Sequence, residues 1–390
     1  MKRLLRVGFD TALLSFIPIL SWFLLSIIVD KNLINVFTIT YPIQFITCMF
    51  KSAFSVGSNI SKEKDKDKYA VGNGIFLTIV LGFIVYGFII INIDKYISFM
   101  NMNISIYRAF TIYSVIQFYI QLIYSSIIEK LYYEEKNKLA NIYSFSFNIL
   151  NFTVLILSAL LFKNSTIIIF LTLTSILLFT IYLVIKEREK VNFKFNIKKW
   201  IRYDSVNFFH HLCFLIIFLF GLSNATSYGE KYTLAISFVA LITDTQWDVF
   251  DSINTVAKID IAKKKFNYKE SKKNAYKLLM LLLFSVFVMF IVFYHNYKLN
   301  FIITLILLGT EIFNYLIYPV YSLKTTYLNL EYSPEKITIN KIVANIGRML
   351  LTLLHTPYCT AIGQVASSFY QFVVLNIIYK KSKRKKIWLL

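Results

Sequence analysis

Three aspartates recur at helical spacing inside a long apolar segment. Residues 232–256 have the length of a membrane-spanning helix, yet they include Asp244, Asp248 and Asp251. Because residues four and seven positions apart lie on one face of a helix, the three carboxylates form a single acidic stripe. An aspartate at mid-membrane costs roughly 2.5–3.5 kcal/mol, so the stripe must face water, a cation or buried partners.

The acidic stripe has two interpretations. Carboxylates that line a pathway through the membrane would bind a cationic substrate or a coupling ion, and the neighbouring Gln246 and Trp247 would add polar and cation–π contacts. Alternatively, part of the stripe lies near the cytoplasmic exit, where Asp251 and Asp260 pair with the lysines that follow. The second interpretation does not account for Asp244.

The composition is that of a polytopic membrane protein. Of the 390 residues, 57% are hydrophobic and 16% are charged, which is more apolar surface than a soluble domain can bury. The net charge of +21 is spread over short connections and the two ends, so it follows the positive-inside rule and does not indicate a nucleic-acid partner. The three cysteines and four histidines form no metal-ligand motif, and we expect neither a metal nor another cofactor.

The hydropathy pattern predicts an all-α fold with about twelve membrane-spanning helices. Even-numbered connections and both ends are rich in lysine and arginine, whereas odd-numbered connections are nearly free of them. This asymmetry predicts a multi-pass protein of the cell membrane with both termini in the cytoplasm, whose basic tail contacts anionic lipids. The predicted spans are residues 8–29, 34–57, 70–93, 107–128, 140–161, 165–185, 203–223, 232–256, 276–294, 299–322, 337–355 and 358–379.

The chain repeats itself at a separation of about 200 residues. The tripeptide FKS at 50–52 is matched by FDS at 250–252, and Asn141 is matched by Asn340. Each half holds an even number of spans, so the halves are predicted to be parallel six-helix repeats. The predicted parts are an N-terminal bundle (1–185), a cytoplasmic linker (186–202), a C-terminal bundle (203–379) and a basic tail (380–390).

Several local sequences resemble the multidrug and toxic compound extrusion (MATE) transporters. They are residues 53–60 (AFSVGSNI) with the charged loop and new span that follow, the polar entry to the fifth span at 134–151, and the eighth span running into 262–277. The resemblance implies a V-shaped pair of bundles that exports organic cations by alternating access, in exchange for H⁺ or Na⁺. We expect a monomer that acts on a small cationic molecule.

The sequence departs from that family at the usual ion site of the first half. Family members often carry an acid late in the first span, whereas residues 20–29 contain none. Asn151 fits the asparagine of the fifth span, but Leu155 stands where many members have an acid. A coupling acid should therefore be sought in the second half. The same superfamily includes flippases for lipid-linked oligosaccharides, which would need lysine and arginine in the cavity; a flippase is the alternative function.

Two charged residues lie mid-depth in neighbouring spans of the second half. Glu311 is in the tenth predicted span and Arg348 is in the eleventh. They form either a buried ion pair, whose disruption would cost about 3–5 kcal/mol, or a coupling site in which protonation of Glu311 releases Arg348.

Two further pairs are hypotheses for gating and proton transfer. Lys51 and Asp251 occupy equivalent positions in the repeats and would form a cytoplasmic gate; the alternative is that Lys51 reaches to the membrane surface by itself. Asp204 and His211 share a helix face and would form a proton relay, whereas an intramembrane histidine also serves as a packing residue.

These observations favour a secondary active antiporter. An intramembrane enzyme would need a nucleophile, a base and a metal set at one depth, and His210 and His211 are poor material for such a set; we expect no enzymatic activity. A scaffold without transport activity remains the alternative suggested by the missing ion site of the first half.

Overall fold

The computed structural model describes residues 16–17, 19–134, 136–262, 264–297, 299–332 and 334–387. Within these ranges, the side chains of residues 64, 137, 205–207, 244–245, 248, 251, 255, 258–259, 262, 296, 329–330, 334–335 and 383–387 are not described. Each regular element in the described ranges is a helix, which confirms the predicted all-α fold.

The helices coincide with the predicted spans. Nine helical segments in the described ranges are long and apolar enough to cross a membrane. The remaining predicted spans correspond to a short apolar helix at Ile19–Ile28, to the long helix that carries the acidic stripe, and to the polar helix that carries Arg348. The chain is therefore a multi-pass membrane protein.

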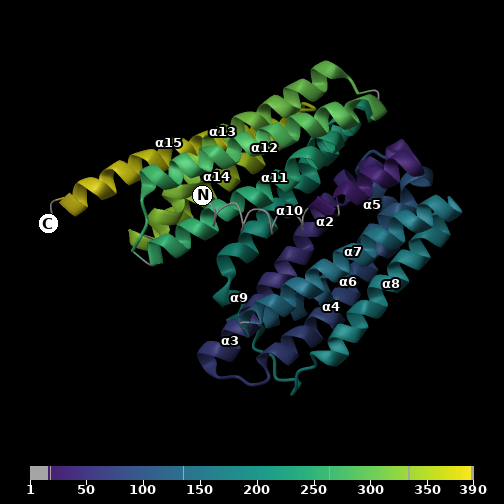
Figure 1. Cartoon of the computed structure of the whole chain (residues 1–390), viewed down its shortest axis with the longest axis horizontal. Helices are drawn as coiled ribbons and strands as arrows, with labels where there is room; N and C mark the ends of the chain where they lie inside the picture. The colour runs from purple at the N-terminus through teal and green to yellow at the C-terminus, as the bar shows by residue number, and fades with distance from the viewer. Residues whose placement is uncertain are drawn as a thin grey trace. The chain divides into compact units, whose positions relative to one another are not determined.

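The chain folds into two compact units, of which the first is Leu20–Leu219. Its central helix is α6, which packs against the helices before and after it. In Figure 1 this unit is coloured purple to teal. Its elements are η1 (Lys31–Leu33), α2 (Ile34–Phe50), η2 (Lys51–Val56), α3 (Gly57–Asp65), α4 (Ala70–Ile91), α5 (Ile93–Phe99), α6 (Ile104–Tyr133), α7 (Asn137–Phe162), α8 (Ser165–Lys186), α9 (Ile197–Tyr203) and the first part of α10 (Ser205–Thr226).

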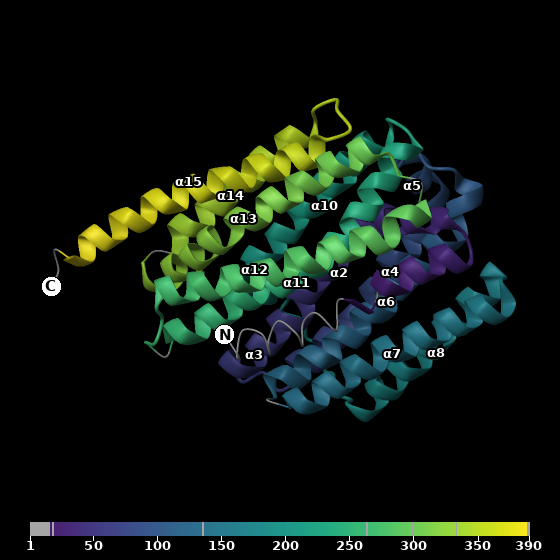
Figure 2. The ribbon, with the colours of Figure 1, turned by 45° about the horizontal axis from the view of Figure 1, so that its top comes forward.

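The second unit, from Phe220 onward, is arranged in the same way. Its central helix α13 contacts α11, α12, α14 and α15, and Figures 1 and 2 both show α13 lying along α15. Its elements are the end of α10, α11 (Glu230–Ala262), α12 (Tyr268–Tyr294), η3 (His295–Tyr297), α13 (Phe301–Glu331), α14 (Pro334–Thr352) and α15 (Cys359–Ile387).

The structure confirms the internal repeat. Helices α11 to α15 begin 194 to 198 residues after α2, α4, α6, α7 and α8, respectively. The capping residues repeat as well, because Asn103 and Asn300 each accept a hydrogen bond at the start of the central helix. The predicted boundaries of the halves, at residues 185 and 203, remain predictions.

The two units differ in the helical path that follows α2 and in its counterpart α11. Residues Lys51–Val56 form a π-helical turn between α2 and α3, whereas the described backbone of α11 is α-helical throughout. A π-turn is an insertion into an α-helix and is common at functional sites. It contains Lys51, one member of the hypothesised gate.

The linker is packed onto the first unit. Trp200 of α9 is fully buried with Ala53, Phe54 and Leu77. The close approach requires glycine on the facing helix, because a Cβ added at Gly57 would lie 2.4 Å from the carbonyl oxygen of Trp200. The linker therefore belongs to the packed core of this unit.

Two polar anchors hold the same segment. The Asn73 amide donates to Asn192 Oδ1 at 2.7 Å and to the Lys194 carbonyl at 2.8 Å. Lys199 Nζ lies 2.7 Å from Asp65 Oδ1, and the Tyr203 hydroxyl donates to the same carboxylate at 2.8 Å. The hydrogen bond from Lys199 holds the pKa of Asp65 below its ordinary value, against the opposing effect of burial.

Gly57→Ala should lower the thermal midpoint of the purified protein, although alanine normally favours a helix by roughly 0.5–1 kcal/mol. The new methyl group would force α3 and α9 apart. Gly87→Ala is the matched control, because no described atom lies within 4 Å of its Cβ position. Equal midpoints for the two variants would contradict the tight packing of the linker.

Asp65→Asn should cost stability at neutral pH, and this cost should shrink as the pH falls below about 4. Because the pKa of Asp65 is lowered in the folded state, its contribution is complete above the unfolded-state pKa. It is lost as the pH falls through the folded-state value. Thermal midpoints of both proteins between pH 7 and pH 3 test this, and a difference that does not change with pH would contradict it.

Candidate functional site

A half-buried carboxylate joins three helices of the second unit. Glu311 lies on α13, and its Oε2 accepts one hydrogen bond from Trp247 Nε1 of α11 at 3.1 Å. The same oxygen accepts a second from Gln364 Nε2 of α15 at 3.1 Å. Both donors are uncharged. They hold the carboxylate of Glu311 in place but do not neutralise its negative charge.

A guanidinium group is connected to this carboxylate through Gln364. Arg348 of α14 is 9% exposed, and its Nη2 donates to Gln364 Oε1 at 3.3 Å. The amide therefore accepts from the cation and donates to Glu311 at the same time. We refer to Trp247, Glu311, Arg348 and Gln364 as the Glu311 cluster.

The sequence analysis places Glu311 and Arg348 in neighbouring spans and Trp247 beside the acidic stripe, and it does not include Gln364. The structure brings all four side chains together, while their role as site residues stays a prediction. Gln364 connects the two charged groups, a role that neither sequence interpretation included. The sequence does not single out Gln364, because Gln371 and Asn376 are amides in the same predicted span.

Aromatic side chains surround Trp247. The Trp247 ring lies 5.0 Å from the ring of Tyr315, 5.2 Å from that of Tyr318 and 5.9 Å from that of Phe250. Tyr315 is fully buried and its hydroxyl donates to the carbonyl of Thr243 at 2.8 Å. A carboxylate beside several aromatic rings is a suitable environment for an organic cation.

Polar groups continue from the cluster along α11 and α13. Asn254 Nδ2 donates to the Tyr318 hydroxyl at 2.9 Å, and Asn254 Oδ1 accepts from the Thr326 hydroxyl at 3.1 Å. Asn314, three residues after Glu311, is fully buried, and neither of its amide atoms has a hydrogen-bond partner among the described residues. Buried amides are normally satisfied, so Asn314 has the capacity to bind water or an ion.

The acidic stripe itself lies outside the described side chains. Asp244, Asp248 and Asp251 are on α11, the helix that contributes Trp247. Gln246 is 2% exposed on the same helix. The stripe remains a prediction.

In the first unit, Asn151 makes a buried contact. The Tyr113 hydroxyl donates to Asn151 Oδ1 at 3.3 Å, and Asn151 is 3% exposed. The ring of Tyr113 lies 6.1 Å from that of Trp22. Leu155, where an acid was sought, is 2% exposed. These contacts are those of a core, and a role for Asn151 in ion binding remains a prediction.

The hypothesised gate residue Lys51 has an ionic partner within its own unit. Its Nζ lies 3.1 Å from Glu129 Oε2 of α6. A gate between Lys51 and Asp251 would therefore require Lys51 to exchange Glu129 for Asp251. The gate stays a hypothesis.

The two members of the hypothesised relay lie in different surroundings. Asp204 is in the turn between α9 and α10, and His211 is two turns into α10. The ring of His211 stacks on Phe45 at 6.4 Å, and its buried Nδ1 has no hydrogen-bond partner among the described groups. A relay role for the pair remains a prediction.

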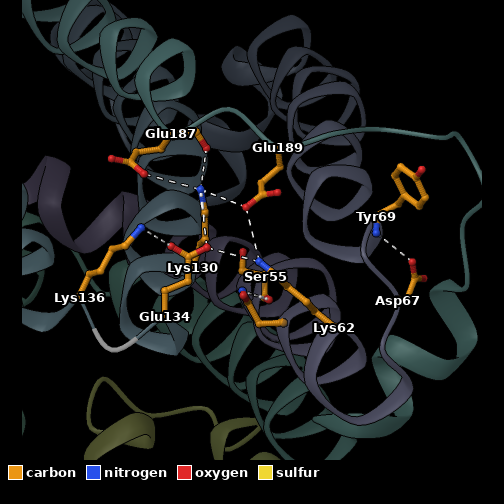
Figure 3. A network of polar contacts seen from close by, with 10 residues as sticks. Ser55, Lys62, Asp67, Tyr69, Lys130, Glu134, Lys136, Glu187 and Glu189 are labelled. Atoms are coloured by element: carbon orange, nitrogen blue, oxygen red, sulfur yellow. Dashed lines mark hydrogen bonds and ion pairs between the residues drawn. The ribbon is translucent and has the colours of Figure 1, made fainter.

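A second cluster of charges lies at the end of α6 (Figure 3). Lys130 is 5% exposed, and its Nζ lies 3.1 Å from Glu189, 3.6 Å from Glu187 and 3.9 Å from Glu134. It also donates to the carbonyl oxygen of Glu187 at 2.9 Å. Lys62 contributes ion pairs to Glu134 at 3.4 Å and to Glu189 at 3.5 Å.

This Lys130 network is an anchor for the linker. Glu187 and Glu189 belong to the segment after α8, and each charge in the network has an opposite charge beside it. A buried cation with three carboxylates is electrostatically satisfied and offers no free charge to a substrate. We therefore assign the candidate site to the Glu311 cluster.

A cavity of about 230 Å³ opens elsewhere in the second unit, between α11 and α12. Its lining includes Asp260, Asn267 and Glu270, and it does not include Glu311. These residues follow the acidic stripe toward the connection between the two helices.

No family model matches the sequence, and no curated protein matches it. Solved structures do match in fold. The inward-facing conformation of a multidrug resistance MATE family transporter of the MOP superfamily superposes with a TM-score of 0.71 at 14% identity, covering 95% of this chain and 96% of that one. The outward-facing conformation of such a transporter gives 0.65 at 13% identity, covering 98% and 96%.

A third structure shares the fold. It is a MOP superfamily transporter from Pyrococcus furiosus, for which a reversed polarity of the binding pocket is taken to suggest a different function. Its TM-score is 0.66 at 13% identity, over 98% of this chain and 96% of that one. The chain therefore has the fold of the MATE transporters within the MOP superfamily.

Glu311→Leu should destabilise the protein more than Glu311→Gln. Leucine leaves the partly buried N–H groups of Trp247 and Gln364 without an acceptor, at a cost of up to about 1–3 kcal/mol for each donor. Glutamine keeps an acceptor oxygen. Thermal midpoints in detergent measure the difference, and equal midpoints would show that the two hydrogen bonds do not hold the helices together.

Proposed function

We propose that the protein is a secondary active transporter that exports organic cations in exchange for H⁺ or Na⁺. The observation that carries the proposal is the Glu311 cluster: a carboxylate held by uncharged donors, next to aromatic rings, in a chain with the fold of MOP superfamily transporters. The multi-pass helical fold and the transporter neighbours support transport in preference to catalysis.

The chemistry of the cluster suits a cation that binds and is then released. Ionised Glu311 would attract a cationic substrate, and the faces of Trp247 and Tyr318 would contact its apolar or quaternary part. Protonation of Glu311 would remove the attraction. Exchange of a proton for the substrate on one carboxylate is a direct physical basis for antiport.

Arg348 gives the exchange a structural consequence. While Glu311 is ionised, Gln364 donates to it and accepts from Arg348. Protonated Glu311 would be a hydrogen-bond donor as well as an acceptor, so the amide of Gln364 would need to reorient and Arg348 would lose an acceptor. Because Arg348 and Gln364 lie on α14 and α15, the protonation state would be transmitted to two helices.

In this proposal the acidic stripe would extend the substrate-binding site and contribute one residue of the cytoplasmic gate. Asp244 and Asp248 precede and follow Trp247 on α11, so they would extend the binding site along that helix. Asp251 would pair with Lys51 when the cytoplasmic side closes.

A flippase for lipid-linked oligosaccharides is the second candidate function. The observation in its favour is Arg348, a buried cation in the same cluster as Glu311. An anionic pyrophosphate headgroup would need such a cation and would be repelled by Glu311.

Cells that express the wild-type protein should extrude ethidium, and a protonophore or removal of Na⁺ should stop the efflux. Glu311→Gln should abolish the coupled efflux because glutamine keeps the hydrogen bonds and cannot bind a proton. Glu230→Gln is the matched control, since Glu230 is exposed at the start of α11, and it should retain wild-type efflux.

The outcomes separate the candidate functions. Efflux that persists in Glu311→Gln would exclude Glu311 as the coupling group. Absence of efflux by well-folded wild type, together with transbilayer movement of a lipid-linked pyrophosphate in proteoliposomes, would replace the proposal with the flippase.

A further inference from the structure

A buried lysine in the second unit has no carboxylate partner among the described side chains, unlike its counterpart in the first unit. Lys324 is 8% exposed on α13 and, counted from the start of the central helix, it lies one turn before the position of Lys130 on α6. Lys130 has three carboxylates within 3.9 Å. Among the residues that the structure describes, no carboxylate oxygen lies within 4.0 Å of Lys324 Nζ.

The described groups that contact the Lys324 amine are uncharged. Its Nζ donates to Asn376 Oδ1 on α15. The same nitrogen lies 5.6 Å from the ring centre of Tyr268 and 5.4 Å from that of Tyr379. These two rings are 5.4 Å apart, so the amine is enclosed by an amide and two phenol groups from α12 and α15.

Two further lysines stand next to these tyrosines along their helices. Lys272 lies one turn after Tyr268 on α12, and Lys380 follows Tyr379 on α15. Lys272 is half-buried and Lys380 is exposed, so the positive charge extends from the buried amine to the surface. Three amines around one enclosure repel each other, and an anion placed among them would remove this repulsion.

The location of this basic enclosure matches the depth of lipid headgroups. Lys324, Tyr268 and Tyr379 each lie within about one turn of the end of an apolar helix that is long enough to cross a membrane. Lysine and tyrosine are typical of the interface between hydrocarbon and headgroups. Lysine is also a common ligand of phosphate groups.

We propose that Lys324, Lys272 and Lys380 form a binding site for a phosphate group, and that this phosphate belongs to the headgroup of an anionic lipid. The lipid would supply the negative charge that Glu134, Glu187 and Glu189 supply to Lys130 in the first unit. The site is independent of the cation transport proposed above. A free phosphate ion has the same chemistry and is distinguished by the experiment.

The test is the thermal midpoint of the full-length protein in a neutral detergent, with added phosphatidylglycerol, phosphatidylcholine or inorganic phosphate. Phosphatidylglycerol should raise the wild-type midpoint by roughly 2–4 °C, whereas phosphatidylcholine and inorganic phosphate should leave it unchanged. A rise with inorganic phosphate alone would overturn the assignment to a lipid. No rise with either anion would overturn the phosphate site.

Two variants test whether Lys324 carries the response. Lys324→Gln should lose the rise with phosphatidylglycerol. Asn376→Asp places a carboxylate beside the amine, so it should raise the midpoint without added lipid and reduce the response to phosphatidylglycerol. The second variant does not remove the lysine and keeps the test decisive if Lys324→Gln fails to fold.

Lys381→Gln is the matched control, because Lys381 is an exposed lysine next to Lys380 on α15. It should keep the full response to phosphatidylglycerol. A response lost equally in Lys381→Gln would assign the effect to the basic surface in general and overturn the site at Lys324. A wild-type response in Asn376→Asp would overturn it as well.

Discussion

The structure depends on one constraint: a charged group among apolar helices must have polar partners, because water is not available to solvate it. Lys130 meets this requirement with three carboxylates from its own chain. Glu311 meets it with two uncharged donors and, through Gln364, with Arg348. The two solutions have different consequences, because a fully paired charge fixes a structure whereas a charge held by uncharged donors can still change its protonation state.

The same constraint explains why Lys130, Glu311 and Lys324 lie on the central helices of their units. The central helices α6 and α13 are surrounded by the other helices of their units, so their polar side chains find partners on several sides. α6 carries Lys130 and the Tyr113 that bonds to Asn151, and α13 carries Glu311 and Lys324. Repetition therefore preserved the position of the central helix while the chemistry of its side chains diverged.

The sequence was sufficient to predict the helices and their repetition, because a span long enough to cross a membrane must be apolar along most of its length. The charge of Glu311 and the indole of Trp247 stand out against such a background, and their role as site residues stays a prediction. The sequence could not predict Gln364 as a bridge, because hydrogen bonding between helices depends on their rotation about their axes. For the same reason the pairing of Lys51 with Glu129 and the contact of Gly57 with Trp200 have no local signature.

The packing of the linker onto the first unit has a consequence for biosynthesis. The sixth predicted span ends at residue 185, but Glu187 and Glu189, which neutralise Lys130, and Trp200, which fills the space beside Gly57, are translated afterwards. Until residues 187–200 have left the ribosome, the first half of the nascent chain therefore has only Glu134 of the three carboxylates around Lys130, and the surface at Gly57 is uncovered. The linker is the last part of the first unit's core to be synthesised before α10. The first half of the chain can therefore reach its final packing only after the linker has been translated.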